Sequence, residues 1–489
     1  MAGIGPADRI APKVLAVGPD LGSRRFIAGA VVLAACAGAL ASFGGTDGEL
    51  AGAGVVVASC LVWLRIETLV GLWLVIALAD PALPELGGLN CSDFVLLIAV
   101  AKLAHDRPRL HRLPPRTGPI LALAWLSEAV VTVFGHTVTS ENPRFLVTLA
   151  GLNLAAYIVW ASPRPAPWIR WLALSSGVAA ILAVAQWTAY RVTGVVIFPT
   201  AQNLFFIRTE IADVFKATGL GIDPNFLGMW IVPGVGIAVI GFLRTKRRLE
   251  YVLFGVLCAL GILATGSRGS LVSAIIGAVI VVFVESASPR RTVSVRRRRI
   301  ATAALVIALL TPAMAVEIDH AIARYPVTVD TRVNQIPAVL HAAVSGNWAG
   351  MGFEAEAAET TGIQTIQSPF LAQENVVHNT LLEALYEAGW LGFLVPLAML
   401  VTGLLAAVRL VRGPSPIAAM IGAGFIVLSV NLQVLGAYAF RPFWFIWALL
   451  LAVDAIARAE PSSATPPTGG GQASRPLSGL AVAPPSRRV

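Results

Sequence analysis

The chain has 489 residues, of which 56% are hydrophobic and 13% charged, and its mean hydropathy is +0.76. Apolar stretches of membrane-spanning length recur along most of it, which indicates an all-α, polytopic integral membrane helical bundle and excludes a secreted protein with a single anchor. The formal net charge of +9 would suit a nucleic-acid partner, but 28 of the 36 lysines and arginines fall in alternate loops on one side of the bundle. That is the positive-inside pattern, so we expect contact with the lipid bilayer and no nucleic acid.

The predicted elements are helices throughout, about 12–14 of them transmembrane, with both termini in the cytoplasm. The predicted spans lie near residues 26–43, 51–65, 68–80, 93–104, 118–135, 145–160, 170–190, 224–243, 249–264, 270–285, 300–315, 379–408, 417–435 and 441–457. We divide the chain into a cytoplasmic N-terminus (1–25), transmembrane helices 1–11 (26–315), one large, partly helical extracytoplasmic loop (316–378), the C-terminal transmembrane helices (379–457) and a disordered cytoplasmic tail (458–489).

The first polar feature on the side with few cations is the segment KATGLGIDPNFLG, which begins at Lys216. Pro224 suits the first position of a helix, and Asp223 can cap that helix. Lys216 stands close to glycines, which suits an anion that approaches the backbone, and Arg208 is a second cation of the same loop. We expect Lys216, Arg208 and Asn225 to bind substrate, while helix capping explains Asp223 and Asn225 equally well.

The apolar stretch 249–284 is too long for one membrane crossing. As a single helix it would be about 54 Å long, against a hydrocarbon core of about 30 Å. The chain therefore has to break, and Thr265–Gly269 (TGSRG) is the polar place for the break. Arg268 then lies in a tight turn between membrane helices, where an unpaired charge costs about 2.5–3.5 kcal/mol. We expect a substrate anion as its partner; lipid phosphate is the alternative.

The longest polar segment, 316–378, is the predicted extracytoplasmic loop. Loops of this length are usually either functional or disordered. This one carries a helix-like pattern over 331–344, followed by a glycine-rich turn, GNWAGMGF, at Gly346–Phe353. Arg332 opens the predicted helix, and we expect it to bind substrate from there.

The stretch HNTLLEALYEAGWLG begins with His378 and Asn379 at the point where the polar loop meets an apolar run. That run predicts a membrane helix over 379–408. The positive end of the helix dipole favours a neutral imidazole, which can accept a proton. We expect His378 to be the catalytic base and Asn379 to bind substrate; a capping histidine at the membrane interface is the alternative.

Several cations and one histidine on the same side of a membrane suit the departure of a diphosphate. Arginine can contact phosphate through two parallel N–H groups, and cations stabilise the charge that develops on a leaving diphosphate. The histidine would take the proton of an attacking sugar hydroxyl. The sequence has no acidic cluster typical of Mg²⁺ binding and no nucleotide-binding P-loop. We therefore expect no metal site, no cofactor and no use of ATP.

These residues resemble the O-antigen ligase and O-antigen polymerase superfamily of bacterial membrane glycosyltransferases, over about Lys216–Gly392. The ligase motif of that family is His, then Asn, Ser or Gln, nine residues, Gly, two residues, and Gly, Thr or Tyr. It is complete here at His378, Asn379, Gly389 and Gly392.

Three further patterns of the family occur in the same order. The TGSRG turn is complete at Thr265–Gly269, the D-P-N segment is Asp223–Asn225, and an Arg-led helix followed by G-x-G-F resembles Arg332 through Phe353. Many members carry an arginine shortly before D-P-N, where this chain has Lys216. Lysine keeps the positive charge but not the two-pronged contact with phosphate.

The resemblance implies an inverting membrane glycosyltransferase that transfers or polymerises a glycan from a polyprenyl-diphosphate-linked donor. The acceptor would be a hydroxyl of a glycan or glycolipid on the extracytoplasmic face of the cell (inner or plasma) membrane, and His378 and Arg268 would be catalytic. Ligase and polymerase activity both remain open. The alternative from another class is a flippase for polyprenyl-linked glycans, which explains the helices and cations but not the large loop with its histidine. A structural component of the envelope is a third possibility.

Overall fold

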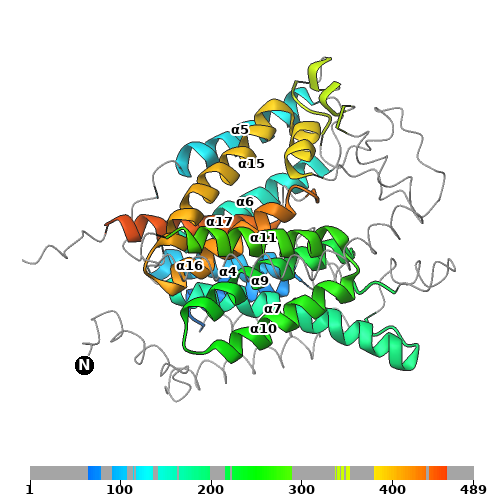
Figure 1. Ribbon diagram of the computed structural model, residues 1–489. Coiled ribbons are helices and arrows are strands. Elements are labelled where there is room, and N and C mark those ends of the chain that lie inside the picture. Colours follow the sequence, from blue (N-terminus) through cyan, green and yellow to red (C-terminus); the bar gives the residue numbers. More distant parts are fainter. Residues whose placement is uncertain are drawn as a thin grey trace, which may run out of the picture.

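A computed structural model describes residues 64–78, 91–106, 114, 117–135, 141–161, 165–198, 215–220, 223–288, 336–337, 339–341, 343–345, 348–352, 379–436 and 440–459. The regular elements of these residues are helices (Figure 1). They are α3 (Ile66–Ile76), α4 (Cys91–Asp106), α5 (Thr117–Phe134), α6 (Glu141–Ala161), α7 (Pro165–Thr193), α9 (Pro224–Arg244), α10 (Arg248–Thr265), α11 (Arg268–Ser286), α15 (Thr380–Arg412), α16 (Pro416–Asn431) and α17 (Arg441–Ala459). Six of the described helices are long and apolar enough to cross a membrane, which confirms the prediction of an all-α, polytopic membrane protein.

The helices follow the predicted spans closely. α7 begins at Pro165 and α16 at Pro416, both earlier than predicted, because proline is well suited to the first turn of a helix. The predicted helices near 26–43 and 300–315, and nearly all of 51–65, lie outside the described residues.

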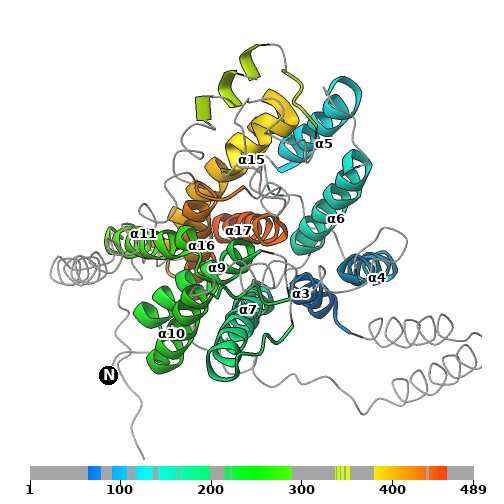
Figure 2. The same ribbon diagram turned by 90° about the vertical axis from the view of Figure 1, so that its right-hand side faces the viewer.

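α17 lies centrally, between α16, α6 and α15 (Figure 2). Every side chain from Phe443 to Leu450 is buried, as expected for a helix that is apolar on all sides. A side-chain hydrogen bond also crosses from a neighbouring helix into this core. The indole N–H of Trp160 in α6 donates to the carbonyl oxygen of Ala448 at 2.9 Å.

The last turns of α9, α11 and α15 meet at one end of the bundle. Arg244, in the last turn of α9, forms an ion pair with Glu285 of α11 at 3.2 Å. The same guanidinium donates to the carbonyl oxygen of Gly413, just beyond α15, at 2.7 Å and to that of Val411. Glu285 is fully buried, so this pair fixes the ends of three helices.

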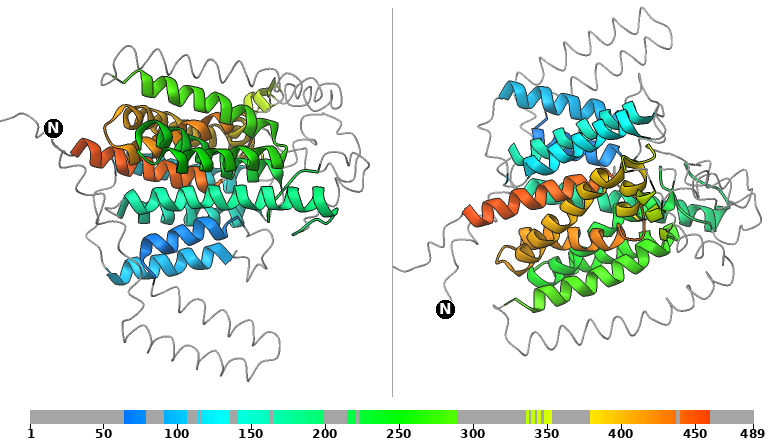
Figure 3. Two further views of the ribbon diagram at one scale, coloured as in Figure 1. Left: turned by 60° about the horizontal axis from the view of Figure 1, so that its bottom comes forward. Right: turned by 90° about the horizontal axis from the view of Figure 1, so that it is seen from above.

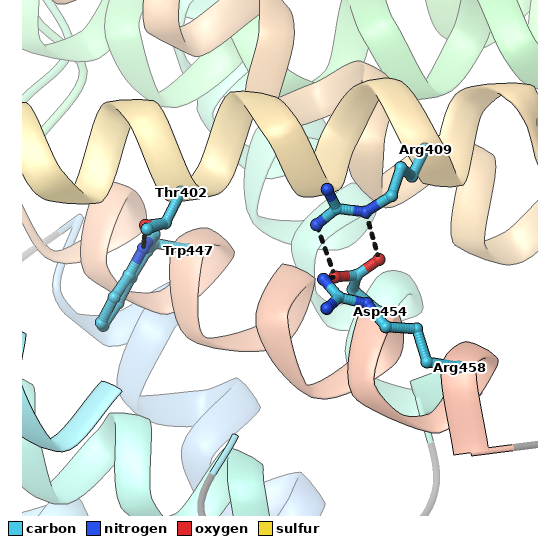
Figure 4. A network of polar contacts seen from close by, with 5 residues as sticks. All are labelled: Thr402, Arg409, Trp447, Asp454 and Arg458. Atoms are coloured by element: carbon cyan, nitrogen blue, oxygen red, sulfur yellow. Dashed lines mark hydrogen bonds and ion pairs between the residues drawn. The ribbon is translucent and has the colours of Figure 1, made fainter. Parts of the chain in front are cut away.

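A second polar network at the same end joins α15 to α17 (Figure 4). Arg409 contacts both carboxylate oxygens of Asp454, at 2.8 and 3.1 Å, and Arg458 also pairs with Asp454. Further along the two helices, the indole N–H of Trp447 donates to the hydroxyl of Thr402 at 3.2 Å. These arginines belong to the larger set in the charge count, and the side of the membrane that this end faces stays a prediction.

α7 is longer than a membrane crossing requires. Its 29 residues extend over about 43 Å, against a hydrocarbon core of about 30 Å. Its C-terminal part projects beyond the neighbouring helices (Figures 1 and 3). This part lies at the end of the bundle opposite to Arg244, where α9, α11 and α15 begin.

Candidate functional site

The start of α9 is built as the sequence predicts. Asp223 is the N-cap, its side chain accepts the backbone N–H of Asn225, and Pro224 occupies the first helical position. Burial raises the pKa of the Asp223 carboxyl, while the Asn225 N–H and the positive charge of Lys216 lower it. The D-P-N segment thus starts a helix and places an acidic group close to Lys216.

The predicted break at TGSRG is confirmed. Most residues of this turn have an identifiable structural role. The Thr265 hydroxyl accepts the backbone N–H of Ser267 at 3.2 Å. Gly266 ends α10 in the left-handed region (φ 61), which favours glycine. Ser267 then caps α11 by accepting the N–H of Ser270. A Cβ on Gly269 would stand 3.2 Å from a methyl group of Val434, so the end of α16 approaches closely.

A chain of hydrogen-bonded polar side chains, most of them buried, ties the starts of α9 and α11 to the end of α16. The Ser267 hydroxyl donates to the amide oxygen of Asn225 at 2.9 Å, and it lies 3.0 Å from the Ser270 hydroxyl. The amide nitrogen of Asn431, the last residue of α16, donates to the Ser270 hydroxyl at 3.3 Å. Three elements from distant parts of the sequence therefore meet at one level of the bundle.

Lys216 lies against the TGSRG turn. The backbone N–H of Ala217 donates to the carbonyl oxygen of Ala264 at 3.0 Å. A Cβ on Gly266 would stand 3.1 Å from Cγ of Lys216. The aliphatic part of the lysine therefore packs over the glycine, and its ammonium group belongs to the same end of the bundle as Arg268.

Arg268 occupies the first turn of α11 and is exposed. Within the part of the chain that the structure describes, no hydrogen bond or ion pair holds its guanidinium group. A cation at a helix start is electrostatically unfavourable, because the dipole there is positive. Arg268 and the N–H groups of the helix start thus present positive charge without compensation from the described residues.

The start of α15 is tied to the end of α16. Asn379 is the N-cap, and its side-chain oxygen accepts the N–H groups of Leu381 and Leu382 at 2.9 and 3.1 Å. Its amide nitrogen donates to the carbonyl oxygen of Gln433 at 2.9 Å. The Thr380 hydroxyl donates to the carbonyl oxygen of Leu435 at 2.9 Å. Asn379 therefore orients the helix start that directly follows His378.

The helix predicted over 379–408 is present as α15, but it is interrupted at Gly389. α15 contains a break there (φ 64, ψ −161). The break frees carbonyl groups that the loop uses: Met351 N–H donates to the oxygen of Tyr386 at 2.8 Å and Gly352 N–H to that of Glu387 at 3.0 Å. The first motif glycine thus creates the docking site for the glycine-rich turn of the loop.

The described part of the loop is helical where the sequence predicts a helix, and it packs on α15 beside that break. Val339, Ala343 and Met351 form a buried cluster with Leu385 and Tyr386 of α15. Ile336 and Leu340, at neighbouring positions of the same stretch, are exposed.

The structure brings four of the seven predicted site residues to one end of the bundle. Lys216 and Asn225 lie against the TGSRG turn that contains Arg268, and Asn379 reaches the same region through residues 431–435, the end of α16 and the turn that follows it. The three remaining predicted site residues, His378, Arg208 and Arg332, lie outside the described residues.

Sequence reasoning missed Gln186, a buried residue of α7. Its side-chain oxygen accepts the backbone N–H groups of Thr218 and Gly219, at 2.8 and 3.0 Å, directly after Lys216. A lone amide inside an apolar helix is the signal that could have found it, because intramembrane polar groups need partners.

Comparison with protein families agrees with the location of this site. Residues 253–397 match the family model described as O-Antigen ligase. The matched range begins in α10 and includes the TGSRG turn, the loop and the start of α15 with its broken helix. No curated protein matches the chain. The protein therefore carries a domain of the O-antigen ligase family in residues 253–397 of a polytopic membrane bundle.

Proposed function

We propose that the protein transfers a glycan from a polyprenyl-diphosphate-linked donor to a hydroxyl group of a glycan or glycolipid acceptor. The observation that carries the proposal is the meeting of three helix starts, α9, α11 and α15, with the cations Lys216 and Arg268 at one end of the bundle. Helix starts bind anions through their unpaired N–H groups and their dipoles. A diphosphate, with several acceptor oxygens and more than one negative charge, suits this arrangement.

In the proposed reaction, Arg268 and Lys216 hold the diphosphate, and Arg332 and Arg208 extend the cationic surface. His378 takes the proton of the acceptor hydroxyl, and the oxygen attacks the anomeric carbon. A new glycosidic C–O bond forms while the bond from that carbon to the diphosphate oxygen breaks. The electron pair leaves with the polyprenyl diphosphate, whose charge the cations stabilise. Attack opposite to the leaving group inverts the anomeric carbon.

Asn379 and Asn225 have a supporting role in this proposal. Asn379 fixes the helix start next to His378, and Asn225 is fixed by Ser267 at the edge of the TGSRG turn. Each amide retains N–H groups that are suited to a sugar or phosphate oxygen. The reaction needs no metal ion or ATP, since the diphosphate bond of the donor supplies the driving force.

The test is transfer by the purified protein. It would be combined with a polyprenyl-diphosphate glycan and candidate acceptors, without ATP or divalent metal. The expected products are the extended acceptor and free polyprenyl diphosphate in equal amounts. Movement of intact donor across vesicles without either product would instead support a flippase.

A further inference from the structure

Gln186 joins two separate segments of the chain through one buried amide. Its oxygen accepts from the backbone of Thr218 and Gly219, at 2.8 and 3.0 Å. Its nitrogen donates to the carbonyl oxygens of Ile197 and Phe198, at 3.0 and 3.1 Å. The stretch of sequence between these segments contains Arg208, so Gln186 contacts residues on both sides of the stretch that carries this cation.

Lys216 lies between two residues whose positions are fixed. On one side, the ring of Phe215 stacks on that of Tyr190, one turn after Gln186 in α7, with centroids 4.3 Å apart and planes at 19°. On the other side, Ala217 is fully buried and donates to the carbonyl oxygen of Ala264. The backbone of Lys216 is thus held between α7 and the end of α10.

Contacts of this kind differ from those of a partly buried side-chain amide that bonds within its own membrane helix. Asn153 in α6 provides the comparison, because its side-chain nitrogen donates to the carbonyl oxygen of Leu149, in its own helix. Gln186 instead bonds to residues outside α7, both just after this helix and just after Lys216. Removal of its oxygen would leave two backbone N–H groups without an acceptor, which is costly in a buried place.

We propose that Gln186 is a positioning residue for the diphosphate site: it holds residues 215–219 so that Lys216 reaches the TGSRG turn. The expected loss of transfer rate rests on the proposed function. The expected loosening of residues 215–219 does not. A displacement of about 1 Å in a group that orients substrate can cost on the order of 10²-fold in rate.

The test compares Gln186→Leu with the matched control Asn153→Leu. Gln186→Leu should lower kcat/KM for the donor by about 10²-fold, and the control should not. In a Lys216→Ala background, Gln186→Leu should cause little further loss, because the group that it positions is absent. Hydrogen exchange at the amides of residues 217–219 should accelerate in Gln186→Leu and remain unchanged in Asn153→Leu.

Two results would overturn the proposal: native exchange of residues 217–219 in Gln186→Leu, or a full further loss of kcat/KM when it is added to Lys216→Ala. If Gln186→Leu does not accumulate in the membrane, Tyr190→Leu tests the same placement through the ring stack, with the same expected pattern. If the native protein transfers no glycan, the proposed function fails, while hydrogen exchange still decides whether Gln186 holds the segment.

Discussion

The carbonyl oxygen of Trp348 lies 2.1 Å from the point that a Cβ on Gly389 would occupy. Gly389 adopts φ 64 and ψ −161, a backbone region populated essentially by glycine alone. The Trp348 oxygen accepts the N–H of Trp390 at 3.1 Å, just beyond the break. The spacing from His378 to Gly389 thus connects the start of α15 with the place where the loop docks on it.

The substitution Gly389→Ala should therefore release the loop from α15. Its conformational cost alone is of order 1–3 kcal/mol, and the clash with Trp348 adds to it. We expect a lower melting temperature in detergent and faster proteolysis of the loop. Gly118→Ala is the control, since a Cβ there meets nothing within 4 Å. Equal melting temperatures for the two variants would contradict the role given to Gly389.

Arg268 should matter for transfer and little for folding. It is exposed and unpaired within the described residues, so Arg268→Ala should leave the melting temperature nearly unchanged while transfer is abolished. Arg268→Lys should remain badly impaired, because a point charge replaces a fork of N–H groups. Lys216→Arg should be tolerated. If Arg268→Ala transferred glycan at the native rate, Arg268 would not be part of the diphosphate site and would instead be a contact to lipid phosphate.

Asp223 should make stability depend on pH. Burial raises the pKa of its carboxyl above the ordinary value of 3.8, so the unfolded chain releases this proton at a lower pH than the folded protein. The stability that Asp223 contributes is fully present below pH 3.8 and is lost as the pH rises through the folded-state pKa.

Asp223→Asn keeps a good N-cap and removes this titration. Its melting temperature should change less with pH across that window and should match or exceed that of the native protein at neutral pH. A lower melting temperature at neutral pH would show that attraction between Asp223 and Lys216 outweighs the cost of burying the carboxylate.

The orientation of the chain can be tested by labelling. Glu356 and Ser294 lie in polar segments on opposite sides of the membrane according to the charge count. Single cysteines introduced there should react with an impermeant reagent from opposite sides of intact cells. Labelling of both positions from the same side would contradict the predicted topology and remove the basis for an extracytoplasmic site.

The features that could be predicted are those with a local cause. The break at TGSRG follows from the length of an apolar stretch against the thickness of a membrane, and the start of α9 follows from Asp223 and Pro224. The break at Gly389 could not be predicted in this way. Glycine is frequent in membrane helices, and the unusual backbone of Gly389 depends on Trp348, which comes from a distant part of the sequence.

The hydrogen-bond partners of the polar residues could not be predicted from the sequence either. Gln186 stands alone in an apolar helix, and nothing near it in the sequence indicates that it binds the segment after Lys216. The grouping of Asn225, Ser267 and Asn431 likewise depends on how α9, α11 and α16 pack. The sequence predicted which cations belong together, whereas the residues that hold them in place required the structure.

The most direct test of the proposed reaction is the turnover of His378→Gln with saturating donor and acceptor, together with its affinity for the donor. Glutamine keeps the size and hydrogen bonding of the side chain but is not a useful base. Turnover should fall by about 10²–10⁴-fold with donor affinity nearly unchanged, and the native rate should fall as the pH drops and the imidazole becomes protonated. Near-native turnover of His378→Gln, or a loss that lies wholly in donor affinity, would contradict the assignment of His378 as the base.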